Sequence, residues 1–319
     1  MTLGNDGPPY EVLAVSPING ARFHQNLDFK EMIMEIFENK VAVITGAASG
    51  IGQALAQKCL EEGMKVMLAD VESQALAATK ASFQERFNNP IESEVVDVGI
   101  VTELERLRDA ALSKFDRVHL LFNNAGVGGA GNAWSGTEKD WAWVLGVNLM
   151  SVIHGQRLFV PHMLEHGEPG HIVNTASVAG LIGGVTNAPY SVTKHGVVAL
   201  TEHLYRDLAG VGSNLGCSVL CPGIINTKIG SSARNRPANL TDAEPAPLTE
   251  QQQAMRAQFQ AIMEQGMAPS EVAEVVFKGI RSQQLYLQTH EHFNPRILDR
   301  AQHMVDGTNP DFSAFNWAN

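Results

Sequence analysis

Short apolar runs rich in β-branched residues alternate with longer, helically patterned segments between Lys40 and Gln288. Most of the short runs are continuously apolar rather than alternating, which is typical of strands in a parallel sheet that is buried on both faces. The expected strands are Val41–Thr45, Lys65–Ala69, Glu94–Val96, His119–Asn123, His171–Thr175, Ser218–Cys221 and Leu285–Gln288. The segments between them are long enough for crossover helices. This order predicts an α/β fold in which a doubly wound, parallel, seven-stranded sheet forms a single domain.

The same pattern divides the chain into three parts. Residues 1–38 contain Pro, Gly and Asn and show little periodicity, so we expect a weakly ordered N-terminal extension outside the core. Residues 39–290 hold all the expected strands and form the predicted domain. Residues 291–319 are a C-terminal tail that could add a helix.

A glycine-rich turn follows the first expected strand directly. The sequence TGAASGIG places Gly46, Gly50 and Gly52 between that strand and a helical pattern, QALAQKCLEEG. Residues without a Cβ atom allow a tight turn and a close approach to a pyrophosphate, and the helix N-terminus offers free N–H groups to the anion. A glycine pattern alone is weak, but strand, loop, helix and a further strand in this order indicate a Rossmann-like dinucleotide site.

Asp70 closes the second expected strand, eighteen residues after Gly52. A carboxylate at this position accepts hydrogen bonds from both ribose hydroxyls of an adenosine and repels a 2′-phosphate. The neighbouring residues that could carry a compensating cation, Ser49 and Val71, are neutral. The sequence therefore predicts NAD as the cofactor in preference to NADP.

Tyr190 and Lys194 are four residues apart in an apolar-periodic segment, PYSVTKHGVVALTEHL. On a helix both side chains project from one face, one turn apart. An ammonium beside a phenol favours the phenolate, so we expect Lys194 to lower the pKa of Tyr190. A tyrosine tuned in this way can exchange a proton with an alcohol or a carbonyl. Any amphipathic helix can hold this spacing by chance, so the pair indicates a catalytic tyrosine only if other motifs in the chain agree.

Net charge limits the partners that we expect, and cysteine content indicates the cellular compartment. The formal net charge of −11 argues against nucleic acid and against an anionic membrane surface. Three cysteines without metal-type spacing, Cys59, Cys217 and Cys221, predict reduced thiols in a cytoplasmic protein. No apolar run is long enough for a membrane span, and the N-terminus lacks the pattern of a secretory signal.

The combined motifs resemble the classical branch of the short-chain dehydrogenase/reductase family over roughly Lys40 to Gln288. Besides TGAASGIG and the YxxxK pair, the chain holds NNAG, VLGVNLM, NTASVAG and CPGIINT. The resemblance implies a catalytic set of Asn148, Ser177, Tyr190 and Lys194. In that set Ser177 would bind the substrate oxygen, Lys194 would also hold the nicotinamide ribose, and Asn148 would hold a water that links Lys194 to solvent.

The expected cofactor contacts combine the glycine loop, the two acidic strand ends and the family motifs. They are Gly46, Ser49, Gly50, Ile51, Gly52, Asp70, Asp97, Val98, Asn124, Ala125, Gly126, Tyr190, Lys194, Pro222, Gly223, Ile225 and Thr227. Thr227 would reach the nicotinamide carboxamide. Relatives assemble as homodimers or homotetramers through two long helices, which here would be about Val147–His166 and Ala188–Leu208.

The family carries a variable substrate lid at the position of residues 228–268, which begin Pro-rich and become helical at Gln251–Gln265. Apolar residues of the lid and of nearby loops predict an apolar substrate pocket, and they are Ile182, Val185, Ile229, Phe259, Met263 and Met267. Arg234 and Arg236 are the nearby cations and do not form an anion clamp. We expect an apolar or aromatic secondary alcohol with its ketone, and the lid resembles that of bacterial dehydrogenases acting on aryl-substituted alcohols.

Several alternatives stay open at this level. A catalytically idle NAD-binding regulatory or scaffold protein could use the same fold, although it has no need of the four catalytic groups together. Epimerase or dehydratase chemistry usually comes with GxxGxxG and a larger C-terminal domain. His162 and His166 are spaced for a metal but lack a third ligand, so no metal site is expected. Trp134, Trp141 and Trp143 are packing residues, or one of them lines the cleft.

Overall fold

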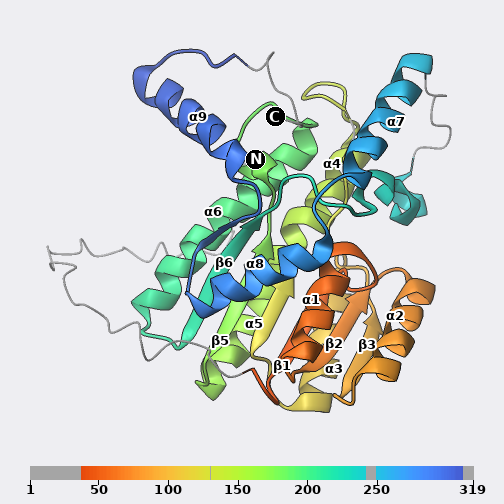
Figure 1. Ribbon diagram of the computed structural model, residues 1–319, viewed down its shortest axis with the longest axis vertical. Helices are drawn as coiled ribbons and strands as arrows, with labels where there is room; N and C mark the ends of the chain where they lie inside the picture. Colours follow the sequence, from red (N-terminus) through yellow and green to blue (C-terminus); the bar gives the residue numbers. More distant parts are fainter. Residues whose placement is uncertain (1–36, 130, 242–248, 312–319) are drawn as a thin grey trace, which may run out of the picture. The chain divides into compact units, whose positions relative to one another are not determined.

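The computed structural model describes residues 37–129, 131–241 and 249–311 (Figure 1). Within these ranges, the side chains at 251, 252, 255 and 256 are not described. Seven parallel strands form one sheet in the order β3-β2-β1-β4-β5-β6-β7. They are β1 Val41–Thr45, β2 Lys65–Asp70, β3 Ile91–Val95, β4 Leu120–Asn123, β5 Gly170–Thr175, β6 Leu215–Cys221 and β7 Tyr286–Gln288. The predicted doubly wound, seven-stranded sheet is confirmed.

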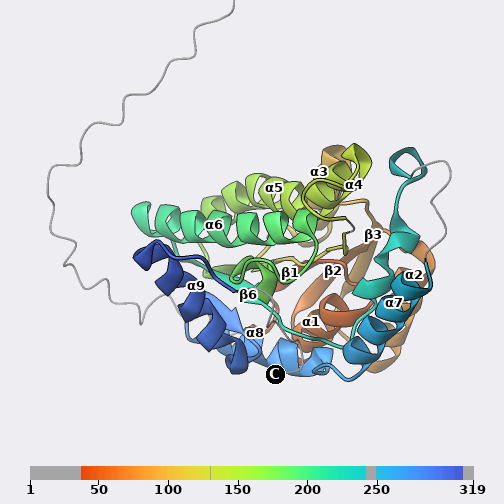
Figure 2. The same cartoon turned by 90° about the horizontal axis from the view of Figure 1, so that it is seen from above.

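Helices cover both faces of the sheet (Figure 2). One layer holds α3 (Val101–Phe115), α4 (Glu138–Leu145), α5 (Ser151–His166) and α6 (Ala188–Gly210). The other layer holds α1 (Gly50–Glu61), α2 (Ser73–Arg86) and α8 (Pro269–Arg281). Each layer buries its own apolar cluster against the sheet, with Phe122 and Phe277 on the α1–α8 side and Phe159 on the α5 side. Burial on both faces explains why most strands are continuously apolar.

The edge strand β3 differs from its expected span, Glu94–Val96. It runs from Ile91 to Val95 and pairs with β2 from Val66↔Ile91 to Asp70↔Val95. Its sequence IESEV has three consecutive polar residues, and Val95 at its end is exposed, so a search for continuous apolar runs misses most of this strand. The other predicted strands agree with the structure to within a few residues at each end.

The strand order reverses between β1 and β4, and their carboxyl ends define the crevice of the sheet. Thr45 at the end of β1 ties the two strands together there. Its Oγ1 accepts hydrogen bonds from the amides of Asn124 and Ala125, at 2.9 and 3.1 Å. Side chains that follow β1, β2, β4, β5 and β6 therefore meet at one edge of the sheet.

The structure describes parts of the chain on both sides of the predicted domain. Phe37 falls in the segment expected to lie outside the core, but it is 3% exposed and its ring centroid lies 5.2 Å from that of Phe277. The rest of that segment, 1–36, lies outside the described residues. The tail forms a 3-10 turn, η6 (Glu291–Phe293), and a helix, α9 (Asn294–Asp306).

We keep the name lid for the segment after β6 that was expected to cover the substrate, 228–268. It consists of the 3-10 helices η4 (Ile229–Asn235) and η5 (Ala238–Leu240), then residues outside the description, then α7 (Glu250–Glu264). The expected helix at Gln251–Gln265 therefore begins and ends one residue earlier. Across the described ranges, no helix combines the length and apolar character that a membrane span requires.

Candidate active site

The loop between β1 and α1 forms the floor of a cleft at the carboxyl edge of the sheet. Gly46 has a φ of +67°, and a Cβ atom there would lie 2.9 Å from the Cα atom of Ala125. At Gly52 a Cβ atom would lie 2.1 Å from the Gly46 carbonyl oxygen, so this glycine lets α1 pack under the loop. Ser49 is the N-cap residue of α1 but makes no side-chain cap hydrogen bond. The first amides of α1 are therefore left for an anion.

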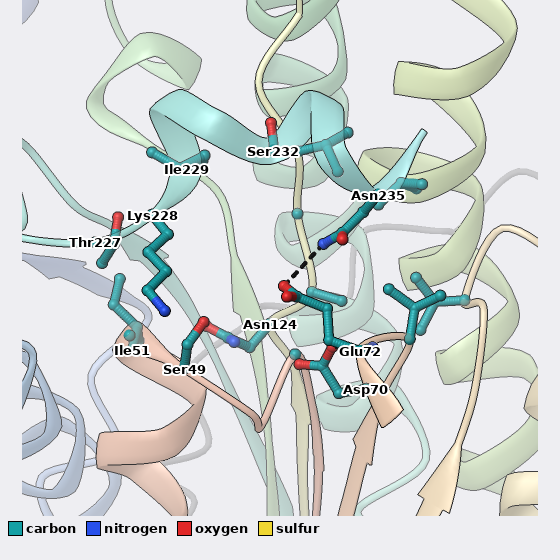
Figure 3. A pocket seen from close by; sticks show the side chains of 18 of the residues that line it. Ser49, Ile51, Asp70, Glu72, Asn124, Thr227, Lys228, Ile229, Ser232 and Asn235 are labelled. Atoms are coloured by element: carbon teal, nitrogen blue, oxygen red, sulfur yellow. Dashed lines mark hydrogen bonds between the residues drawn. The ribbon is translucent and has the colours of Figure 1, made fainter. Parts of the chain in front are cut away.

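Asp70 lies at the next strand end, inside the same cleft (Figure 3). Its two carboxylate oxygens accept hydrogen bonds from the amides of Ala48 and Glu72, both at 2.9 Å. Burial raises the pKa of Asp70, and these two amide bonds oppose that shift. Each oxygen keeps a further lone pair, so the carboxylate can still accept hydroxyl groups of a ribose.

Ser177, Tyr190 and Lys194 come together where β5 ends. Ser177 follows β5 and caps the turn η3 (Val178–Gly180), with its Oγ accepting from the Ala179 amide at 3.1 Å. Asn187 caps α6 by accepting from the Tyr190 amide at 3.0 Å, which places Tyr190 and Lys194 in its first turns. Ser177 and Lys194 are 8% and 2% exposed. All three groups are therefore held by rigid elements.

The pKa of Tyr190 differs in direction from the sequence-based expectation. Burial raises it, and a hydrogen bond from Ser177 acts in the opposite direction. Lys194 Nζ donates to the Thr175 carbonyl at 2.8 Å and lies 5.5 Å from the centroid of the Tyr190 ring, over the ring itself. Burial also lowers the pKa of Lys194 to about 8. The YxxxK spacing brings the two side chains close together, but burial decides the direction in which the pKa of Tyr190 changes.

Asn148 lies in a π-helical turn, η2 (Gly146–Met150), at the start of the long helix expected from Val147. Its side-chain amide makes a reciprocal pair with the backbone of Val127, at 2.8 and 2.9 Å. A Cβ atom at Gly126 would lie 3.5 Å from both Asn148 Oδ1 and Lys194 Nζ, so both side chains lie close to Gly126. In this arrangement Asn148 fixes the loop after β4, and π-turns of this kind are frequent at functional sites.

A second cavity of about 400 Å³ adjoins the cleft. Ser177 and Tyr190 lie in its wall, together with the apolar side chains of Trp143, Ile224 and Phe259. Trp143, Ile229 and Ser232 line both the cavity and the cleft. The two spaces are therefore neighbours, and Tyr190 faces the one that can receive a small molecule.

Most predicted cofactor residues line the cleft, which contains Gly46, Ser49, Gly50, Ile51, Asp70, Asp97, Val98, Asn124, Ala125, Gly126 and Thr227. Gly223 and Tyr190 line the cavity instead. Ile225 is 2% exposed and packs in the apolar core, while Pro222 accepts a hydrogen bond from the Val178 amide. Of the six apolar residues expected around the substrate, Ile229 and Phe259 line the cavity. Ile182 and Val185 pack behind it with Phe293.

Several residues that line the cleft were not among the expected cofactor contacts. They are Val71, Glu72, Val96, Val127, Trp143, Val147, Thr175, Lys228, Ile229, Ser232, Arg234 and Asn235. Thr175 could have been found as the last residue of β5. The lid residues could not, because their place depends on contacts with residues more than a hundred positions away, such as Gly128 and Glu72.

Comparisons with known proteins agree with this geometry. The short chain dehydrogenase family model matches residues 40–238, and the chain belongs to this family of oxidoreductases acting on CH–OH groups. A short-chain dehydrogenase/reductase from Burkholderia phymatum, solved in complex with NAD, is 42% identical with a TM-score of 0.84, covering 89% of this chain and 100% of that one.

Two curated relatives cover most of the chain at lower identity. A CLA biosynthesis dehydrogenase/reductase from Lactiplantibacillus plantarum is 31% identical over 87% of this chain and 97% of its own length. A C alpha-dehydrogenase from Sphingobium is 31% identical over 87% of this chain and 89% of its own length. At 282 and 278 residues, both matches are longer than the stretch that the family model matches.

The residues of the cleft fit the nicotinamide cofactor that the family binds. The uncapped amides at the start of α1 suit a pyrophosphate, and Asp70 suits an adenosine ribose. The cleft continues past Gly126 and Thr175 to Thr227, next to the cavity that holds Tyr190. An extended dinucleotide along this path would bring its nicotinamide end to the chemically active side chains.

Proposed function

We propose that this protein interconverts a neutral secondary alcohol and its ketone with NAD, and that Tyr190 is the acid/base. The observation that carries this proposal is the placement of Ser177 and Tyr190 in the wall of a cavity of about 400 Å³ beside the dinucleotide cleft. When bound, NAD supplies the hydride acceptor for oxidation of the alcohol. The protein side chains supply orientation and proton transfer.

In this proposal Ser177 and Tyr190 hold the substrate oxygen between them. Ser177 stabilises charge that develops on that oxygen, and Tyr190 takes the hydroxyl proton during oxidation or returns it during reduction. Lys194, which is fixed by the Thr175 carbonyl, holds a positive charge near the ring of Tyr190 and favours its anion. Asn148 keeps the loop beside Lys194 in place through Val127.

The charge balance of the cavity supports a neutral substrate. Arg236, the cation in the cavity wall, already has a carboxylate partner, with its Nη1 at 2.6 Å from Asp140, and Arg234 on the cleft side has its Nη2 at 2.5 Å from Glu72. Trp143, Ile224 and Phe259 make the remaining wall largely apolar. An anionic substrate would have to displace one of these carboxylates, whereas an apolar or aromatic alcohol fits without doing so.

Asp70 and the NAD complex of the Burkholderia relative support NAD over NADP. The three free, buried cysteines support the cytoplasmic location expected from the sequence. Exposed apolar side chains on α5 and α6, namely Leu164, Val192 and Tyr205, support a homodimer or homotetramer formed through these helices. Light scattering after size exclusion would show a monomer if that proposal is wrong.

A panel of alcohols tests the function directly. Neutral aryl and alkyl secondary alcohols are compared with carboxylate-bearing analogues of the same size, with NAD and with NADP, by following the reduced nicotinamide. We expect kcat/KM to favour neutral substrates by about tenfold or more and to favour NAD. A preference for the carboxylate analogues would contradict the neutral pocket, and a preference for NADP would contradict the role of Asp70.

A further inference from the structure

The 3-10 helix η4, Ile229–Asn235, crosses above the dinucleotide cleft, and we call it the strap (Figure 3). Ile229, Ser232, Arg234 and Asn235 of the strap line the cleft from one side. Asp70, the last residue of β2, and Glu72 line it from the opposite side. The adenosine end of a dinucleotide would therefore lie between the strap and the edge of the sheet.

Three hydrogen bonds join the strap to Glu72 across this cleft. Arg234 donates through Nη2 to Oε1 at 2.5 Å and through Nε to Oε2 at 3.3 Å. Asn235 Nδ2 donates to Oε1 at 3.0 Å, and this bond is drawn in Figure 3. The carboxylate is thus held in a bidentate, charge-assisted contact between residues 162 positions apart.

The strap presents Arg234 to Glu72 in a fixed orientation. Arg234 Nη1 also donates to the Lys228 carbonyl at 3.2 Å and to Ser231 Oγ at 3.1 Å. The Arg234 and Glu72 side chains are 34% and 28% exposed, so water screens the contact only in part. The hydrogen bonds from Arg234 and Asn235 lower the pKa of Glu72, which keeps it ionised. A preorganised, partly buried pair is stronger than an ordinary surface ion pair.

A separate set of contacts holds the other side of the lid. Ser232 Oγ accepts from the Gly128 amide at 2.8 Å, and Arg236 pairs with Asp140 on α4. These contacts border the substrate cavity, where Ser232, Arg236 and Asp140 all lie. Breaking the contacts with Glu72 would therefore free the adenosine side of the strap and leave the substrate side in place.

We propose that Glu72, Arg234 and Asn235 form a latch that closes the adenosine end of the cleft and sets the rate at which the cofactor leaves. This inference rests on the proposed binding of NAD in this cleft. The three residues are positioning residues, since they hold the strap over the cofactor and take no part in the reaction itself. Cofactor release requires the strap to lift, so weakening the latch increases the dissociation rate.

Stopped-flow fluorescence of NADH release, without substrate, tests the latch. We expect Glu72→Gln and Arg234→Gln each to raise the dissociation rate by about fivefold to tenfold, because a charge-assisted contact is lost. The double variant should release NADH no faster than either single variant, because both substitutions break the same contact. Glu274→Gln is the matched control, since it removes an equivalent carboxylate that pairs with Lys58 on the far side of α1 at 2.7 Å.

Hydrogen exchange of the strap amides in the cofactor-free protein gives a second readout. We expect faster exchange in Ile229–Asn235 for Glu72→Gln and wild-type exchange for Glu274→Gln. Dissociation rates within twofold of wild type, or additive effects in the double variant, would overturn the latch. A wild-type protein that binds no NADH would instead contradict the proposed function, and the latch would fall with it.

Discussion

The two sides of the active-site cleft are built from different kinds of contact. On the chemical side, Ser177 and Lys194 are nearly inaccessible to water and are anchored by the Ala179 amide in η3 and the Thr175 carbonyl at the end of β5. On the lid side, Arg234 and Arg236 hold the covering segment through ion pairs to Glu72 and Asp140. Backbone anchoring holds Ser177 and Lys194 in place, whereas the ion pairs of the proposed latch would let the lid open. We therefore expect changes on the chemical side to alter kcat and changes on the lid side to alter binding and release.

Substitution of Ser177 should give the largest effect among the supporting residues. Ser177→Ala removes the hydroxyl that would stabilise charge on the substrate oxygen, and we expect kcat to fall by about 10²- to 10³-fold. Steady-state kinetics with the best alcohol of the panel measures this loss. Because Ser177 also caps η3, Ser177→Thr is the control that keeps a hydroxyl. An equal loss in both variants would contradict the role of the hydroxyl, because Ser177→Thr keeps it.

Asp70 should control the choice of cofactor. Asp70→Asn keeps the shape of the side chain but loses its charge, so we expect the preference for NAD over NADP to fall by about fiftyfold. The ratio of the kcat/KM values for the two cofactors measures this preference. An unchanged ratio would place the discrimination elsewhere in the cleft.

Phe293 in the tail should support the chemical side from behind. It is 2% exposed and packs in one cluster with Val178, Ile182 and Tyr190. Phe293→Ala leaves a cavity next to the Ser177 turn and Tyr190, and a small displacement of reacting groups is costly, so we expect kcat to fall about tenfold with little change in KM. Phe293→Leu, which fills much of the space, should recover most of the rate. A lower unfolding temperature with unchanged kcat would limit Phe293 to stability.

Arg236 should give the smallest effect and should act on the substrate alone. Its Nη1 pairs with Asp140 at 2.6 Å and its Nε donates to the Leu240 carbonyl at 2.6 Å, beside the cavity. We expect Arg236→Gln to raise the KM for the alcohol about threefold, as for loss of a single ion pair, and to leave NADH release unchanged. Faster NADH release in this variant would show that the two sides of the lid open together.

The sequence and the structure agree best where local rules decide the outcome. Apolar runs revealed a sheet that is buried on both faces, and the glycine loop, Asp70 and the YxxxK pair lie where strand ends meet. The position of the strap could not be predicted from local rules, because Glu72 contacts Arg234 only after the chain has folded. The pKa of Tyr190 also depends on tertiary structure, since burial outweighs the hydrogen bond from Ser177.

The most direct test of the account is the pH dependence of alcohol oxidation in the wild-type protein and in Tyr190→Phe, with NADH binding measured on the same samples. Because burial raises the pKa of Tyr190, the phenol stays neutral to higher pH, so wild-type oxidation should speed up as the pH rises and the phenolate forms. Tyr190→Phe should bind NADH normally but lose this rise, with turnover lower by about 10³-fold. Turnover in Tyr190→Phe within tenfold of wild type, with the same pH profile, would contradict the assignment of Tyr190 as the acid/base.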